Sequence, residues 1–233
     1  MDIIGSKIPV KPITIDYSEC AIFKGARILF SHLEEGLECV RKQRIKDVCI
    51  WQDTDQTRYT VNLDFLKEME FIETFDFNIK LSKKSNIEGL YSLNKLKKFG
   101  WAVGNHFDID FSRLTTIESM NINYRDGLLN LGKLTKLKKL YVQSVKEDDL
   151  KFLSELENLE LLRIIHGRFI SLEGLESCKK LKELDLRRCF NLVHVAATLH
   201  KLSFLEYVAL DSCRKHDVNI KEFESKISKI WSS

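Results

Sequence analysis

Four stretches in the second half of the chain decide the fold: LKKLYVQSV at residues 137–145, LELLRIIHG at 159–167, LKELDLRRC at 181–189 and LEYVALDSC at 205–213. Each stretch has apolar residues at its first, fourth and sixth positions, as Leu181, Leu184 and Leu186 illustrate in the third. A polar residue between the last two apolar positions is typical of a short strand with one buried face. The recurrence of this pattern at nearly constant spacing predicts a structural repeat.

The repeat extends outward from these stretches and covers residues 63–213. The last apolar position of each copy falls at residues 77, 101, 122, 142, 164, 186 and 210, so copies recur every 20 to 24 residues. Such a period is typical of a solenoid. Ile45, Val48 and Ile50 resemble the strand portion of one further, degenerate copy, so we expect the solenoid to occupy residues 46–213.

The segments between the strands carry an apolar residue at every third position, as in Leu172, Leu175 and Cys178. This spacing suits a 3₁₀ or short α turn that runs back along the opposite side of the same core. A single copy buries roughly six apolar side chains at roughly 1.5–3 kcal/mol each, which cannot offset the ordering of roughly twenty residues at roughly 1–2 kcal/mol each. The copies must therefore stack, with their strands in parallel.

The four stretches resemble the core of the leucine-rich repeat family, in which Leu-x-x-Leu-x-Leu is followed, after two further residues, by Asn or Cys. Cys189 and Cys213 match that last position, whereas the other five copies depart from it with Lys80, Gly104, Arg125, Val145 and Gly167. The repeat length resembles the short-repeat intracellular and bacterial subclass. This resemblance implies an α/β leucine-rich repeat solenoid with a parallel sheet on its concave face, used as a protein-binding scaffold.

Both ends of such a solenoid need a cover for their apolar edges. Residues 1–45 predict an N-terminal cap: a hairpin of two strands, then a helix that begins with a capping box at Ser31 and Glu34. Residues 214–233 predict a C-terminal capping helix, with a second capping box at Asn219 and Glu222. Its apolar stripe comprises Phe223, Ile227, Ile230 and Trp231.

Composition excludes several classes of protein. The chain has 233 residues, of which 44% are hydrophobic and 30% charged, with a formal net charge of +3. These values argue against a disordered chain and give no electrostatic reason to expect nucleic acid or an anionic membrane as partner. The chain contains no run of about 18 apolar residues, so the sequence predicts no membrane-spanning helix. The six cysteines lack paired short spacings, so we interpret them as reduced thiols of a cytoplasmic protein.

Function is expected on the polar strand positions, which must point outward from the concave sheet and form columns about 4.8 Å apart. Aromatic and aliphatic residues next to arginines on this surface are typical of protein interfaces. We therefore predict a non-catalytic module that binds a protein partner, without a cofactor or metal. The predicted partner-binding residues are Trp51, Asp76, Asn121, Asn123, Lys139, Tyr141, Gln143, Leu161, Arg163, Ile165, Asp185, Arg187, Tyr207 and Asp211.

Several alternatives stay open at this point. The partner role could be that of an inhibitor or immunity protein, or that of a regulatory or adaptor subunit. An RNA-associated protein would use Lys98 and Lys139 as part of a phosphate track, although aspartates share the same surface. An enzyme would use His166 and Cys189 as base and thiol. The simplest alternative is an ordinary solvated surface, with Trp51 packed under the N-terminal hairpin.

Overall fold

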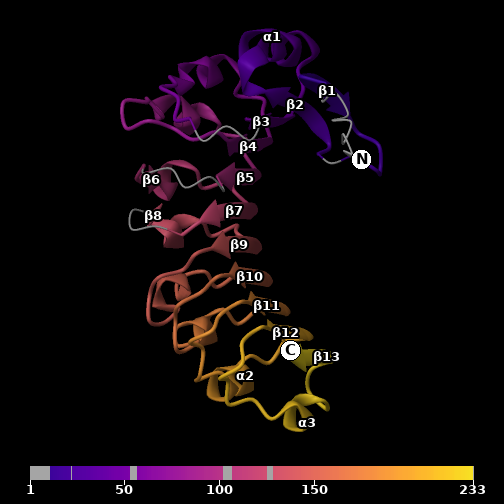
Figure 1. Ribbon diagram of the computed structural model, residues 1–233, viewed down its shortest axis with the longest axis vertical. Coiled ribbons are helices and arrows are strands. Elements are labelled where there is room, and N and C mark those ends of the chain that lie inside the picture. Colours follow the sequence, from indigo (N-terminus) through magenta and orange to yellow (C-terminus); the bar gives the residue numbers. More distant parts are fainter. Residues whose placement is uncertain (1–10, 22, 53–56, 102–106, 125–127, 233) are drawn as a thin grey trace, which may run out of the picture.

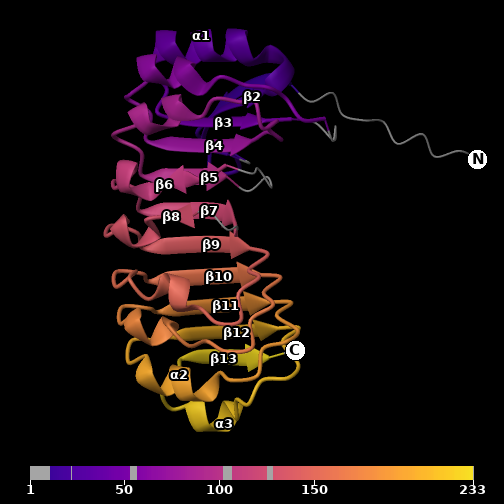
Figure 2. The same ribbon diagram turned by 90° about the vertical axis from the view of Figure 1, so that its left-hand side faces the viewer.

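The computed structural model describes residues 11–21, 23–52, 57–101, 107–124 and 128–232. Its main element is an eleven-stranded sheet in the order β1-β2-β3-β4-β5-β7-β9-β10-β11-β12-β13. The strands stack along the long axis of a curved rod and line its inner side, with the helical turns on the outer side (Figure 1). Turned by 90°, the strands from β3 onward run side by side in one direction (Figure 2).

The elements follow the repeat. The first part of the chain forms β1 (Ile13–Asp16), β2 (Gly25–Leu29), α1 (Leu33–Gln43), β3 (Asp47–Trp51), β4 (Thr74–Asn78), β5 (Lys98–Trp101), β6 (Ile109–Asp110) and β7 (Ser119–Asn123). The second part forms β8 (Leu128–Leu129), β9 (Lys139–Gln143), β10 (Leu161–Ile165), β11 (Glu183–Arg187), α2 (Ala196–Lys201), β12 (Tyr207–Asp211), α3 (Ile220–Phe223) and β13 (Lys229–Ser232).

The sheet is parallel throughout except for the antiparallel pair β1 and β2. Its register aligns Leu140, Leu162, Leu184 and Val208 as direct neighbours in successive strands, all of them buried. The predicted solenoid and its parallel sheet on the concave side are confirmed. The core is therefore a single continuous column of apolar side chains that runs the length of the rod.

The outer side of the rod consists mainly of short 3₁₀ turns, as the spacing of three predicts. Several of them begin in the same way, with a side-chain oxygen that accepts a hydrogen bond from the backbone N–H two residues later. This cap satisfies a donor that the turn itself leaves free. Asn62 and Asp110 are the N-caps of their turns. Asn86, Asp149 and Ser171 make the same hydrogen bond in the residues just before the turn that follows each of them.

The N-terminal cap contains the predicted hairpin and helix. The face of α1 that carries Leu37 and Val40 is buried, and the helix packs closely on β2 because Gly36 has no side chain: a Cβ there would lie 2.5 Å from Cγ2 of Ile28. The predicted capping box at Ser31 is wrong. The Ser31 hydroxyl contacts the ring of His32 instead, and no side-chain hydrogen bond caps α1.

The predicted C-terminal capping helix is also wrong. Only the four-residue α3 forms, and the chain then becomes strand β13, which pairs in parallel with β12 and continues the sheet beyond residue 213. The free edge of β12 offers unpaired backbone groups, and β13 satisfies them, which a helix could not do. The side chain of Asn219 does not cap α3, so the second capping box is absent as well.

Replacing Leu162 tests the apolar column. We expect Leu162→Ala to lower the free energy of unfolding by about 2–5 kcal/mol, because it leaves a cavity at a fully buried position. Its matched control is Leu161→Ala, the same change one residue earlier on the half-buried concave side, with an expected loss of about 1 kcal/mol or less. Urea unfolding followed by circular dichroism measures both. Equal losses in the two variants would contradict the alternation of faces.

Glu73 links three repeats at the amino ends of β3, β4 and β5, because its carboxylate lies 2.7 Å from Nζ of Lys46 and 2.6 Å from Nζ of Lys97. These two ammonium groups lower the pKa of Glu73 from 4.5 to about 2. A carboxyl group whose pKa is lower in the folded state stabilises the fold above its unfolded-state pKa and loses this contribution as the pH falls. The stabilisation by Glu73 should therefore fade between about pH 4.5 and pH 2.

Glu73→Gln tests this dependence. We expect the substituted protein to be less stable than the parent at pH 6, and to match it only below about pH 2, where Glu73 is protonated in the folded state as well. Urea midpoints measured across this pH range give the difference. A constant gap between the two proteins at all pH values would contradict the assignment of the effect to the Glu73 charge.

Candidate partner-binding surface

The concave face of the sheet consists of three columns of side chains, each defined by the strand register. The first column comprises Asp47, Thr74, Lys98, Ser119, Lys139, Leu161, Glu183, Tyr207 and Lys229. The middle column comprises Arg27, Cys49, Asp76, Gly100, Asn121, Tyr141, Arg163, Asp185, Ala209 and Trp231. The third column contains Trp51 and Asn78 in the N-terminal half, and Asn123, Gln143, Ile165, Arg187 and Asp211 beyond them.

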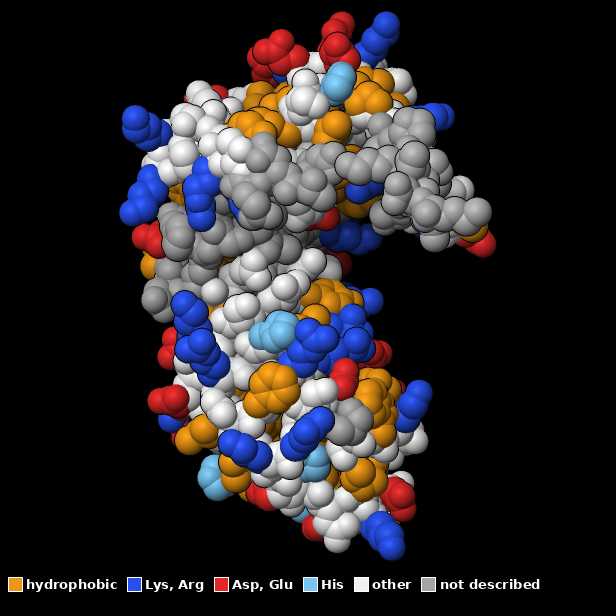
Figure 3. Space-filling model, viewed as in Figure 1, with side chains coloured by type: hydrophobic (Ala, Val, Ile, Leu, Met, Phe, Trp, Pro, Cys, Tyr) orange, Lys and Arg blue, Asp and Glu red, His pale blue; other side chains and the backbone are white. Residues whose placement is uncertain are grey.

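The fourteen residues predicted from the sequence all lie in these columns, on one face of one sheet. They do not form one cluster, however. The C-terminal half of the face carries linked arginines and aromatic rings, whereas the N-terminal half is polar and hollowed. The hollow side of the arc is on the right in Figure 3.

An arginine cluster occupies the centre of the C-terminal half. The Arg163 guanidinium donates from Nε to Oδ2 of Asp185 at 2.7 Å. Arg187 donates to the same carboxylate twice, at 2.9 Å from Nε and at 2.9 Å from Nη2. Asp185 is only 4% exposed, so it acts as the buried anchor that fixes both guanidinium groups rather than as a surface group. The two arginines remain partly exposed to solvent.

Aromatic side chains flank this cluster on both sides. The guanidinium carbon of Arg163 lies 5.5 Å from the ring centre of Tyr141, within the range of a cation–π interaction. Towards the C-terminus, Nε1 of Trp231 donates to the Tyr207 hydroxyl at 3.3 Å. Sequence reasoning missed Trp231 because it placed residues 223–231 in a helix. The neighbouring Ile230 and Trp231, a β-branched and an aromatic residue, belong to the types that favour strands and were the available signal.

The N-terminal half contains a hollow of about 280 Å³ at Gly100. The Asp76 carboxylate lies directly against the backbone of Gly100: a Cβ on Gly100 would lie 2.1 Å from Oδ1 of Asp76. Oδ1 accepts a hydrogen bond of 3.0 Å from Nδ2 of Asn78. Burial raises the pKa of Asp76. The residues that line the hollow are Phe23, Thr74, Asp76, Lys98, Phe99, Gly100, Ser119, Asn121 and Tyr141.

Phe23 comes from the connection between β1 and β2, and sequence reasoning gave no sign that it would reach this hollow.

The hairpin of β1 and β2 also determines the surroundings of Trp51. Arg27 from β2 lies 4.2 Å from the centre of the Trp51 ring, which is half-buried. Trp51 is therefore partly covered by the hairpin and held by a cation–π contact. The neighbouring Cys49 thiol is buried, which together with the Asp76 charge raises its pKa to about 12.

His166 and Cys189 do not form a base–thiol pair. His166 is exposed, whereas Cys189 is fully buried and its thiol donates to the backbone oxygen of Arg187 at 3.6 Å. A hydrogen bond with the neighbouring Cys213 thiol and burial both raise the pKa of Cys189, which keeps it protonated and weakly nucleophilic. Within the described part of the chain, no group of three or more His, Cys, Asp and Glu side chains could hold a metal ion.

Lysines do not form a continuous track on the concave face. Lys98 and Lys139 share the first column with Ser119 between them, and acidic residues stand in the same column at Asp47 and Glu183. This mixture of positive and negative charges is a poor match for a polyanion.

Basic side chains gather instead at the carboxyl ends of the strands, the side that faces the viewer in Figure 3, around an exposed hydrophobic group. Lys146, Arg168, Arg188 and the 57% exposed Phe190 surround a hollow there.

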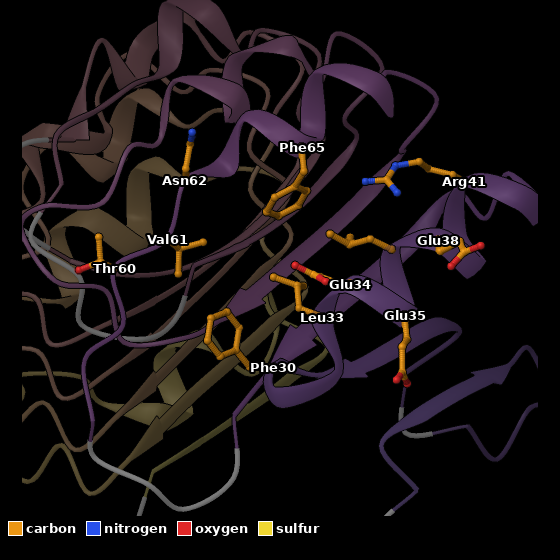
Figure 4. Close-up of a pocket in the computed structure, with 11 residues that line it drawn as sticks. Phe30, Leu33, Glu34, Glu35, Glu38, Arg41, Thr60, Val61, Asn62 and Phe65 are labelled. Carbon is orange, nitrogen blue, oxygen red and sulfur yellow. The ribbon is translucent and has the colours of Figure 1, made fainter.

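A second groove lies at the N-terminal end of the rod, between α1 and residues 60–65, and has a volume of about 740 Å³. In Figure 4, Phe30, Leu33 and Phe65 gather at its centre, and Glu35 and Glu38 lie along the α1 side. Leu37 and Val61 close its base and are almost fully buried. The groove thus lies along the junction between the N-terminal cap and the first repeat.

The register of the parallel strands and the spacing of the buried leucines define a leucine-rich repeat solenoid. No protein-family model and no curated protein sequence matches the chain. Among solved structures, the chain is similar to an internalin C2 from Listeria monocytogenes, with a TM-score of 0.55 and 17% identity over 76% of each chain. This likeness supports the leucine-rich repeat fold.

Two further solved structures from Listeria monocytogenes are similar to the chain. An internalin F gives a TM-score of 0.49 and 15% identity over 78% of this chain and 60% of that one. The functional domain of InlJ gives a TM-score of 0.46 and 14% identity over 81% of this chain and 47% of that one.

Among the described residues, no helix has the length and apolar character needed to span a membrane.

The arginine cluster can be tested by charge removal. Arg163→Met together with Arg187→Met leaves the buried Asp185 carboxylate without a cation while keeping an unbranched apolar stem at both positions. We expect the free energy of unfolding to fall by about 1–2 kcal/mol, less than the roughly 3–5 kcal/mol for breaking a fully buried ion pair, because both arginines are partly solvated. Adding Asp185→Asn should restore most of the lost stability, because the uncompensated charge of Asp185 is then removed. If the third substitution lowers stability further, Asp185 does not depend on these arginines.

Proposed function

We propose that this protein is a non-catalytic binding module that holds a protein partner against its concave face. The observation that carries the proposal is the cluster of Tyr141, Leu161, Arg163, Ile165 and Arg187 on adjacent positions of three neighbouring strands. Aromatic and arginine side chains dominate the binding energy of protein interfaces, and a buried anchor such as Asp185 holds them in place before binding.

The rigidity of the sheet also supports this proposal. Each guanidinium of the cluster stands on a strand paired on both sides, so little ordering entropy would be lost when a partner docks. The leucine-rich repeat fold adds general support, because curved solenoids present extended concave surfaces to their ligands. The surface presents its side chains in rows over many strands, which suits a broad contact with a protein.

Tyr141→Ala combined with Leu161→Ala tests the proposal. The protein and its variants are used to capture partners from lysate of cells that carry the gene, and the affinity of the recovered partner is then measured by biolayer interferometry. We expect the double variant to lose more than about tenfold in affinity, because both side chains leave the centre of the surface. The matched control is Phe204→Ala, which removes an apolar side chain that is 62% exposed outside the columns. Its affinity should equal that of the parent protein.

An unchanged affinity in the double variant would reject the concave face as the binding surface. Thermal unfolding of both variants provides the check on folding. If the captured material is instead sensitive to nuclease, and binding weakens steeply with salt and after replacement of Lys98 and Lys139, an RNA-associated function replaces the proposal.

Within protein binding, we propose that the module covers a functional surface of its partner, in the manner of an inhibitor or immunity protein in the cytoplasm. A single rigid face can bind one partner and exclude that partner's other ligands. A regulatory or adaptor subunit is the alternative. Adding the module in equal amount to the isolated partner separates the two, because an inhibitor lowers the partner's activity and an adaptor does not.

A further inference from the structure

Two aspartates in the middle column have opposite surroundings. Asp185 is compensated by two arginines at 2.7 and 2.9 Å. Asp76 stands at the equivalent strand position in the N-terminal half, yet forms no ion pair within the part of the chain that the structure describes. Its direct polar contact is with the amide of Asn78. A carboxylate that is partly withdrawn from water without a cation is costly, and its raised pKa reflects this.

The space beside Asp76 is open towards the concave face. Gly100, the next residue in the middle column, contributes no side chain, so the Asp76 carboxylate reaches into the hollow. Neutral side chains of Thr74, Ser119 and Asn121 line its walls, and the ring of Tyr141 lies at its C-terminal side. These groups are hydrogen-bond acceptors and a π-face, which are the chemical complements of a cationic side chain.

We propose that the hollow at Gly100 receives a lysine or arginine side chain of the partner protein, with Asp76 as its counter-ion. This inference rests on the proposed function and specifies the partner's chemistry at that site. With a volume of about 280 Å³, the hollow lies just below the usual range of small-molecule pockets, about 300–1,000 Å³, and suits a single side chain. One carboxylate is too few for calcium, which takes six to eight oxygen ligands.

Lys98 also lines the hollow, and its effect on the binding of a cation can be compared with that of Asp76. It stands in the first column, is exposed, and forms no ion pair with Asp76 or with any other described residue. Its positive charge therefore repels an incoming cation, while the charge of Asp76 attracts it. Neutralising these two residues should therefore shift the affinity for a cation in opposite directions.

The test uses a small probe, so that it does not depend on the identity of the partner. The uniformly ¹⁵N-labelled protein is titrated with N-acetyl-arginine amide at constant ionic strength, and N-acetyl-citrulline amide serves as a neutral control of nearly the same shape. We expect saturable shifts of the Gly100 and Asn121 amide signals with the arginine probe only. Asp76→Asn should weaken the affinity at least about tenfold, and Lys98→Gln should strengthen it about two- to threefold.

Equal shifts with the citrulline probe, or an unchanged affinity in Asp76→Asn, would overturn the proposal. So would shifts that concentrate on Tyr207 and Trp231 instead of the hollow, or a response to calcium but not to the arginine probe. The partner itself provides the second readout. If Tyr141→Ala with Leu161→Ala abolishes partner binding while Asp76→Asn leaves it unchanged, the concave function stands and this inference fails. If the arginine probe binds but no partner uses the concave face, the proposed function fails while the cation site remains.

Discussion

The side-by-side stacking of Leu140, Leu162, Leu184 and Val208 removes from water the apolar strand faces that no single repeat could bury by itself. Because side chains alternate along a strand, this burial also fixes which residues must point the other way. A shift of one residue in any strand would expose its leucines. The register of the buried leucines therefore also determines which side chains the concave surface presents and how they are aligned.

In-register stacking imposes an electrostatic condition on that surface. Each side chain has neighbours about 4.8 Å away at the same position of the adjacent strands, so like charges in one column would repel. The chain satisfies this condition by placing neutral or opposite residues next to each charge. Asp185 lies next to Arg163, and Lys139 lies between Ser119 and Leu161. Asp76 has Cys49 and Gly100 as its neighbours, which avoids repulsion but leaves its charge uncompensated.

The sequence predicts this architecture because the repeat is local, and the spacing of leucines alone sets the register of Arg163 against Asp185. It does not predict that Asp185 is buried, since this depends on how two long side chains fold over it. The C-terminal helix was predicted wrongly because Phe223 and Ile227 fit a helical stripe, whereas the free edge of β12 favours a strand. Phe23 and Arg27 reach the concave face through the hairpin, whose position the sequence pattern does not encode.

Tyr141 joins the two halves of the concave face, since its ring borders the hollow beside Asp76 and also faces the Arg163 guanidinium. The negative charge of Asp76 and the positive charges of Arg163 and Arg187 are thus separated along the rod axis with an aromatic ring between them. A partner that matches both ends must carry a basic side chain at one end of its contact surface and acidic or acceptor groups at the other. If the partner docks on the concave face as proposed, reversing it along the rod would bring like charges together, so this arrangement would select one docking direction.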